Sequence, residues 1–151
     1  LFTILTEIIF RHGGTVDKFI GDSVMAFWGA PNPIENHAEL ALRAAEDMMR
    51  WLEVGNEGWK QKYGIEIRLA IGVNTGEAVV GNFGSKERME YTAIGDCVNV
   101  AARLETIARP QQVLITKATK DAAGESFDYV PLGSRHVVGR KASVELFEVV
   151  V

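Results

Sequence analysis

The order of its predicted elements indicates that this chain forms an α+β sandwich, in which helices cover one face of a mostly antiparallel sheet. Two observations predict this class. Runs of β-forming residues come in pairs joined by short glycine-containing links, which is typical of antiparallel hairpins. Between these pairs lie segments whose apolar residues recur at helical spacing. The 151 residues, 47% apolar and 24% charged, suffice for a single domain with one hydrophobic core.

The first residues predict a helix. Apolar side chains recur at helical spacing from Leu1 onward, and the pattern ends near His12 because Gly13-Gly14 breaks it. Since the apolar stripe is present from the first position, we expect the helix to begin upstream. The chain then represents a fragment of a longer protein, spanning a single domain over residues 1–151.

A β-hairpin should follow this helix. Residues 15–20 and 23–28 are rich in β-formers, and only Gly21 and Asp22 separate them. Glycine in the first position of a two-residue link is what a type II′ turn prefers. The sequence therefore predicts a hairpin with its tip at Gly21-Asp22.

The middle of the chain predicts a long helix and a second hairpin. Residues 38–51 carry apolar side chains at helical spacing, and the pattern allows the helix to continue toward Tyr63. Beyond it, residues 66–74 and 77–82 are strand-like runs on either side of Thr75-Gly76. We expect these two runs to pair with each other.

The last third predicts one more helix among short strands. Residues 89–93 are strand-like, and a helix over about 97–108 should follow, with Asp96 as its N-cap and Pro110 ending it. Further strand candidates are residues 112–116, 129–132, 136–138 and 144–149.

Composition excludes several classes of protein. The formal net charge is -4 and no stretch is densely basic, so the chain lacks the electrostatic footprint of a nucleic-acid binder. Cys97 is the only cysteine, which rules out an internal disulfide and suits a reducing, cytoplasmic compartment. No apolar run approaches the roughly 20 residues that span a membrane, although a longer parent protein can carry an anchor elsewhere.

The first predicted hairpin carries two groups suited to chemistry. Lys18 and Asp22 are four residues apart, hence over about 10 Å along a strand, too far to pair with each other. A carboxylate at an exposed turn is well placed to bind a hard cation. The alternative is that Asp22 is only a turn former and Lys18 a solvated strand residue.

The last predicted helix carries a second polar pair. Asn99 and Arg103 are four residues apart and share one helix face, while Val100 and Leu104 lie on another. An amide and a guanidinium pointing the same way suit an anionic ligand that bears hydroxyl groups. The alternative is an ordinary polar face with Arg103 in a surface ion pair.

Two glycine-rich stretches, residues 72–76 and 81–85, lack the spacing of a phosphate-binding loop. Taken singly, they are best interpreted as tight turns. In their order and spacing, however, all these features closely resemble class III adenylyl/guanylyl cyclase catalytic domains over nearly the whole chain. The segments that carry the resemblance are residues 12–14, 17–22, 72–76, 81–85 and 95–105.

The resemblance implies a ferredoxin-like fold that acts as a head-to-tail homodimer, with nucleotide bound between the subunits. Asp22 matches the second of two metal-binding aspartates, for two Mg²⁺ or Mn²⁺ ions, and Lys18 and Thr92 match the pair that recognises the purine. Asn99 matches the residue that orients the ribose, and Arg103 the one that stabilises phosphate charge in the transition state. One subunit would supply the metal ligand and the other the purine-reading pair.

The chemistry of Lys18 favours ATP as the substrate. An ammonium group only donates hydrogen bonds, so it can bind the unprotonated N1 of adenine, whereas N1 of guanine carries a hydrogen. The Thr92 hydroxyl can accept from the adenine amine, but it can also donate and so discriminates less. We therefore expect an adenylate cyclase, which forms cyclic AMP and pyrophosphate by attack of the ribose 3′-hydroxyl on the α-phosphorus.

Two departures from the family pattern limit this expectation. The strand that carries the first metal-binding aspartate is missing before Leu1, so we expect the chain alone to be weakly active or inactive. Val138 stands where the family often has a phosphate-contacting lysine, and Arg140 or Lys141 is a possible substitute. The runner-up is therefore a cyclase-like module that binds nucleotide or dimerises without catalysis. An RNA-binding ferredoxin-like domain is disfavoured, because it requires a basic surface and stacking aromatics.

Overall fold

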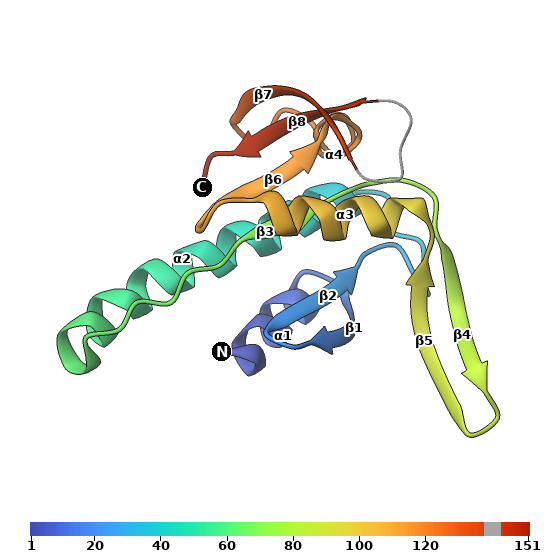
Figure 1. The fold of residues 1–151 in the computed structure, drawn as a ribbon, viewed down its shortest axis with the longest axis horizontal. Helices are drawn as coiled ribbons and strands as arrows, with labels where there is room; N and C mark the ends of the chain where they lie inside the picture. Colours follow the sequence, from blue (N-terminus) through green and yellow to red (C-terminus); the bar gives the residue numbers. More distant parts are fainter. Residues whose placement is uncertain (138–142) are drawn as a thin grey trace.

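The computed structural model describes residues 1–137 and 143–151. Over these residues it contains four helices and eight strands, which form a four-stranded sheet and two separate two-stranded hairpins. Figure 1 shows the long helix α2 running behind the molecule, with the four-stranded sheet on one side of it and the first hairpin on the other. Four of the five strand pairings are antiparallel, as predicted. The α+β class is confirmed.

The first helix and hairpin form as the sequence predicts. Helix α1 (Phe2–Arg11) is followed by β1 (Thr15–Ile20) and β2 (Ser23–Phe27), which pair antiparallel. Gly21 has a φ of +59° whereas Asp22 has no positive φ, which fits the predicted type II′ turn. The buried face of α1 packs on α2, so the hairpin is held against the body of the domain.

Helix α2 (His37–Tyr63) extends through both halves of the predicted segment and ends at Gly64, whose φ is +66°. Its first half supplies apolar side chains to the largest core cluster, whose buried members are Ala38, Leu42, Ala45, Met49, Val113, Ile115, Ala123, Phe127 and Val149. Its second half extends past the rest of the molecule, as Figure 1 shows. There Trp51 and Trp59 stack edge to face, with ring centroids 5.3 Å apart.

The four-stranded sheet has the order β3-β6-β8-β7, with β3 (Ile71–Val73), β6 (Val113–Thr116), β7 (Tyr129–His136) and β8 (Ser143–Val149). Strand β6 is buried along its whole length, because Val113 and Ile115 face α2 while Leu114 packs with helix α3. Helices therefore cover both faces of this sheet, not one face as the sequence suggested.

The predicted hairpin around Thr75-Gly76 is wrong. Strand β3 pairs in parallel with β6, and the residues after it enter the separate hairpin of β4 (Val79–Ser85) and β5 (Arg88–Ile94). A parallel pair needs a crossover connection, which α3 (Asp96–Ile107) provides between β3 and β6. Residues 81–85, predicted as a tight turn, lie within β4, and the hairpin projects from the body of the molecule (Figure 1).

The start of α3 differs by one residue from its prediction. Gly95 is the N-cap, with a φ of +140°, and its carbonyl oxygen accepts hydrogen bonds from the backbone of Val98 and Asn99 at 3.2 Å each. Asp96 therefore lies in the first turn rather than at the cap. Its negative charge there still favours the helix, because the N-terminus of a helix carries partial positive charge.

The C-terminal third contains one helix that the sequence did not predict, α4 (Lys117–Ala123), whose N-cap Thr116 accepts a hydrogen bond from the Thr119 backbone. Strand β7 is continuous where two short strands were expected, with an irregularity between Pro131 and Gly133. The predicted strand end Val138, and the candidate phosphate-binding residues Arg140 and Lys141, lie outside the described residues. Across residues 1–137 and 143–151, no helix is both long and apolar enough to cross a membrane.

Candidate functional site

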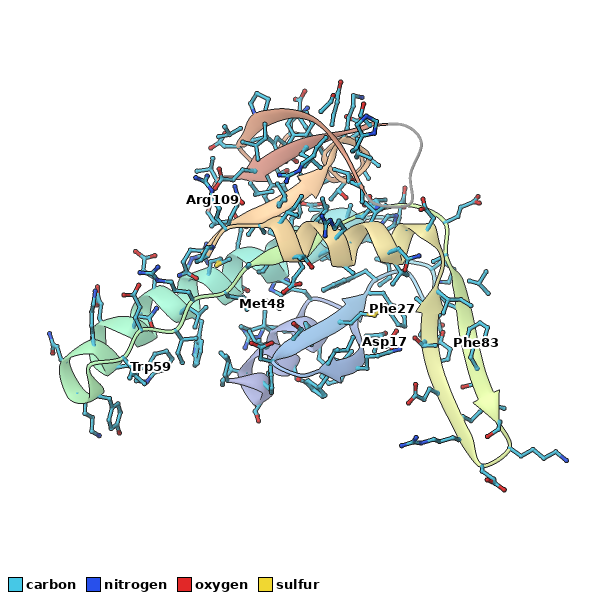
Figure 2. The ribbon with its side chains drawn as sticks, in the orientation of Figure 1. Asp17, Phe27, Met48, Trp59, Phe83 and Arg109 are labelled. Atoms are coloured by element: carbon cyan, nitrogen blue, oxygen red, sulfur yellow. The ribbon has the colours of Figure 1, made fainter. Side chains whose placement is uncertain are left out.

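The centre of the candidate site is a buried carboxylate, that of Asp17 on β1. The pairing of β1 with β2 shifts register between Val16 and Lys18, so Asp17 is the extra residue of a β-bulge. A bulge redirects side chains that would otherwise alternate strictly across a strand. The Asp17 side chain is only 1% exposed, and Figure 2 shows it on the side of the hairpin that faces β5.

Asp17 joins β1 to β5 through two hydrogen bonds to one oxygen. The hydroxyl of Thr92 donates to Oδ2 at 2.6 Å, and the backbone N–H of Ala93 donates to the same Oδ2 at 3.1 Å. Thr92 itself is 5% exposed. A buried carboxylate needs such partners, because an unpaired buried charge is strongly unfavourable.

The second oxygen of Asp17 lies near Lys18. The ammonium Nζ of Lys18 is 3.5 Å from Asp17 Oδ1, and the Lys18 side chain is 38% exposed, so it can still reach a ligand. The sequence predicted that Lys18 does not pair with Asp22, and the described residues contain no ion pair between the two. Lys18 and Thr92, predicted as a pair from distant parts of the chain, are thus brought to the two oxygens of one carboxylate.

Asp22 lies exposed at the tip of the β1–β2 hairpin. Within the described part of the chain its side chain makes no hydrogen bond or ion pair, and no group of three or more His, Cys, Asp and Glu residues is positioned to hold a metal ion. A divalent cation such as Mg²⁺ is held by one or two carboxylates together with waters and substrate phosphates. Asp22 fits one such ligand, but these residues alone do not form a two-metal site.

Asn99 and Arg103 both lie exposed on α3, while Val100 and Leu104 on the same helix are buried at 2% and 0% exposure. The predicted separation of a polar and an apolar face is therefore present. No ion pair of the described residues includes Arg103, so the alternative of a surface ion pair gains no support. An exposed guanidinium and amide one helical turn apart remain able to contact an anionic ligand.

The predicted site residues of one chain are not gathered in one cluster. Lys18 and Thr92 meet at Asp17, whereas no described hydrogen bond or ion pair links Asp22, Asn99 or Arg103 to that cluster. A surface groove of about 490 Å³ lies along α2, lined mainly by residues of its second half, and includes none of the predicted site residues. Within a single chain, therefore, only Lys18 and Thr92 of the predicted site residues are brought together.

Sequence reasoning did not single out Asp17. Its partners Thr92 and Ala93 lie 75 and 76 residues further along the chain, and a bulge leaves no mark in the hydrophobic pattern. The available signal was a charged residue in the interior of a run of β-formers, four residues before the turn that ends the run. Such a residue must either face solvent or be paired, and here it is paired.

Comparison with known proteins agrees with this geometry. The sequence model described as the adenylate and guanylate cyclase catalytic domain matches residues 1–149. Adenylate cyclase 1 of Rhizobium meliloti is 39% identical over 151 residues, covering 99% of this chain and 23% of that protein. The chain thus spans under a quarter of that relative's length.

Solved structures show the same fold. The adenylyl cyclase CyaB from P. aeruginosa superimposes with a TM-score of 0.91 at 31% identity, covering 99% of this chain and 78% of that one. The guanylyl cyclase Cya2 superimposes with a TM-score of 0.88, also at 31% identity, covering 98% and 75%. Overall similarity therefore does not distinguish the two purines. This chain belongs to the family of adenylate and guanylate cyclase catalytic domains.

Proposed function

We propose that this domain converts ATP into 3′,5′-cyclic AMP and pyrophosphate, as a phosphorus-oxygen lyase in signal transduction. The observation that supports it most is the meeting of Lys18 and Thr92 at Asp17, since the resemblance assigns these two residues to purine recognition. Two chain segments more than 70 residues apart meet at this carboxylate, beside the partly exposed ammonium group of Lys18.

Adenine is the base that suits this ammonium. Lys18 offers only donors, and N1 of adenine is an acceptor whereas N1 of guanine bears a hydrogen. With guanine, the Lys18 ammonium and the N1–H would be two donors facing each other. At a desolvated contact this costs at least one hydrogen bond. The name of the Rhizobium meliloti relative agrees with this choice, while the similarity to Cya2 shows that it depends on few residues.

The reaction would be carried by positioning and charge neutralisation. Arg103 would stabilise the charge that develops on the phosphates, and Asn99 would hold the ribose so that its 3′-oxygen faces the α-phosphorus. Asp22 would hold a Mg²⁺ or Mn²⁺ ion, the first of two, with the other ligands supplied by the substrate, by water and by groups outside the described residues. When bound, such ions neutralise triphosphate charge and acidify the 3′-hydroxyl.

A head-to-tail homodimer would complete the site. Within one chain Asp22 is separated from the purine-reading pair, and in a symmetric dimer each chain can give its metal ligand to one site and its purine-reading pair to the other. The projecting β4–β5 hairpin carries the exposed apolar side chains of Val79, Met89 and Ile94, at 62%, 61% and 46% exposure. A partner chain would cover them. We place the reaction in the cytoplasm, where ATP is available.

One observation favours a second candidate, a module that binds nucleotide or dimerises without catalysis. Among the described residues only Asp22 matches one of the two expected metal-binding aspartates, and no group of three or more His, Cys, Asp and Glu residues is positioned to hold a metal ion. Such a module would bind ATP and not turn it over.

The two candidates are separated by assaying the full-length protein with ATP and Mg²⁺ or Mn²⁺. We expect cyclic AMP and pyrophosphate in equal amounts, and a fall of at least about 100-fold in kcat for Asp22→Ala, because the metal ion loses a ligand. Glu125→Ala, which removes an exposed carboxylate in the loop after α4, is the matched control and should retain activity. Full turnover by Asp22→Ala would contradict the metal assignment, and ATP binding without product would favour the second candidate.

A further inference from the structure

We infer that Asp17 is a specificity-determining residue, which sets the preference for adenine by holding the Thr92 hydroxyl as a hydrogen-bond acceptor toward the base. The inference rests on the proposed function, because it concerns the same purine contact. It adds a residue to that contact and changes the chemical character of another. Asp17 is a positioning residue in this account, since it acts on the base only through Thr92.

The direction of the hydrogen bond between Thr92 and Asp17 follows from their chemistry. An ionised carboxylate only accepts, so the single hydroxyl proton of Thr92 is directed to Asp17 Oδ2, 2.6 Å away. What the Thr92 oxygen has left for a ligand is its lone pairs. A threonine that by itself can donate or accept is thereby reduced to an acceptor.

An acceptor at this position distinguishes the two purines at their 6-position. Adenine carries an amine there, which donates, whereas guanine carries a carbonyl oxygen, which only accepts. A Thr92 oxygen with its proton held by Asp17 can bond the amine but faces the guanine carbonyl lone pair to lone pair. Lys18 tests N1 of the base and Thr92 tests the 6-position, so the two contacts favour adenine independently.

Several contacts fix the orientation of the Asp17 carboxylate. Its Oδ2 also accepts from the Ala93 N–H at 3.1 Å, its Oδ1 lies 3.5 Å from Lys18 Nζ, and its side chain is 1% exposed. The β-bulge at Asp17 directs it toward β5. Because Ala93 follows Thr92 directly, the oxygen that anchors the strand is the one that captures the hydroxyl proton.

The test measures kcat/KM for ATP and for GTP with the full-length protein. For Asp17→Ala we expect the ratio of ATP to GTP to fall about tenfold, the value of one hydrogen bond, because Thr92 becomes free to donate to the guanine carbonyl. Asp17→Asn is the matched control. Its amide oxygen can take the place of Oδ2 for both donors, so the ratio should stay within about twofold of the unmodified protein.

A double-mutant cycle with Thr92→Val separates this role from a structural one. If Asp17 acts through the Thr92 hydroxyl, Asp17→Ala should leave the ratio unchanged in the Thr92→Val background. The same fall in both backgrounds, or no fall in either, would overturn the inference. A general loss of stability would lower turnover of both nucleotides alike and leave their ratio intact.

A spectroscopic measurement covers the case in which Asp17→Ala does not fold. In the unmodified protein the Thr92 hydroxyl proton should exchange slowly with water and give a resolved NMR signal, since it is buried and hydrogen-bonded. The absence of that signal would overturn the inference. A full-length protein that cyclises neither nucleotide would overturn the proposed function and this inference with it, whereas cyclic AMP formation with an unchanged Asp17→Ala ratio would overturn this inference alone.

Discussion

At the scale of single residues, the proposed purine contact depends on which atoms carry hydrogen. Lys18 has three donors and no acceptor, and Thr92 has its one hydroxyl proton directed to Asp17. In the proposed contact, both groups would therefore present a fixed pattern to the base, a donor at N1 and an acceptor at the 6-position. This pattern is complementary to adenine and opposite to guanine at both positions.

Reversing the charge of residue 18 should change the nucleotide preference. Lys18→Glu places acceptors where a donor stood, so we expect kcat/KM for ATP to fall at least about tenfold. The ratio of kcat/KM for ATP to that for GTP should fall by a larger factor. Lys62→Glu, which makes the same charge change near the end of α2, serves as the control. The assay is cyclic nucleotide formation from each triphosphate. Unchanged selectivity would mean that the base is recognised elsewhere.

The individual site residues could be proposed from the sequence because the resemblance lies in contiguous motifs. The contact that joins two of them, through Asp17, could not be predicted. Asp17 acts on Thr92 across 75 residues, through a bulge and a strand contact that no local pattern encodes. The exposure of Asn99 and Arg103 followed from helical periodicity alone, since Val100 and Leu104 on the same helix had to be buried.

At the scale of elements, local structure was predictable and long-range pairing was not. The tip of the first hairpin forms at Gly21-Asp22 because the two-residue link itself determines the turn. Strand β3, by contrast, pairs with β6, about 40 residues later in the chain. The Thr75-Gly76 link therefore wrongly suggested a hairpin. The short helix α4 was not predicted, because seven residues are too few to show a clear helical periodicity.

The contact of β3 with α3 positions Asn99 and Arg103 relative to the sheet, and it depends on Gly72. A Cβ added there would overlap the Glu105 backbone nitrogen and lie 2.7 Å from the Ala101 carbonyl oxygen. Backbone atoms cannot move aside as a flexible side chain can. We therefore expect Gly72→Ala to lower the free energy of unfolding by roughly 1–3 kcal/mol, measured by urea denaturation.

Gly58 offers the matched control for this prediction. It lies in α2 with nothing within 4 Å of an added Cβ, so Gly58→Ala should raise the free energy of unfolding by about 0.5–1 kcal/mol through helix propensity. Equal urea midpoints for Gly72→Ala and the unmodified protein would show that β3 does not pack on α3 as closely as described.

At the scale of the whole molecule, one chain presents two incomplete halves of a site. Asp22 stands exposed at one hairpin tip, and Lys18 of the proposed purine-reading pair lies over about 10 Å away along β1. Thr92, the other member of that pair, lies on β5. The β4–β5 hairpin projects from the domain, as Figure 1 shows, and its apolar side chains of Val79, Met89 and Ile94 are exposed. Two chains arranged head to tail would bring a metal ligand from one to a purine-reading pair from the other, twice over.

The most direct test of this account is complementation between two variants of the full-length protein that are each impaired with ATP. In a heterodimer of Asp22→Ala and Lys18→Glu, one site contains both changes and the other contains neither. Random pairing of equal amounts should therefore restore about a quarter of the unmodified cyclic AMP production, since half of the dimers are mixed and each has one intact site. A mixture no more active than the average of its two components would contradict a site shared between chains.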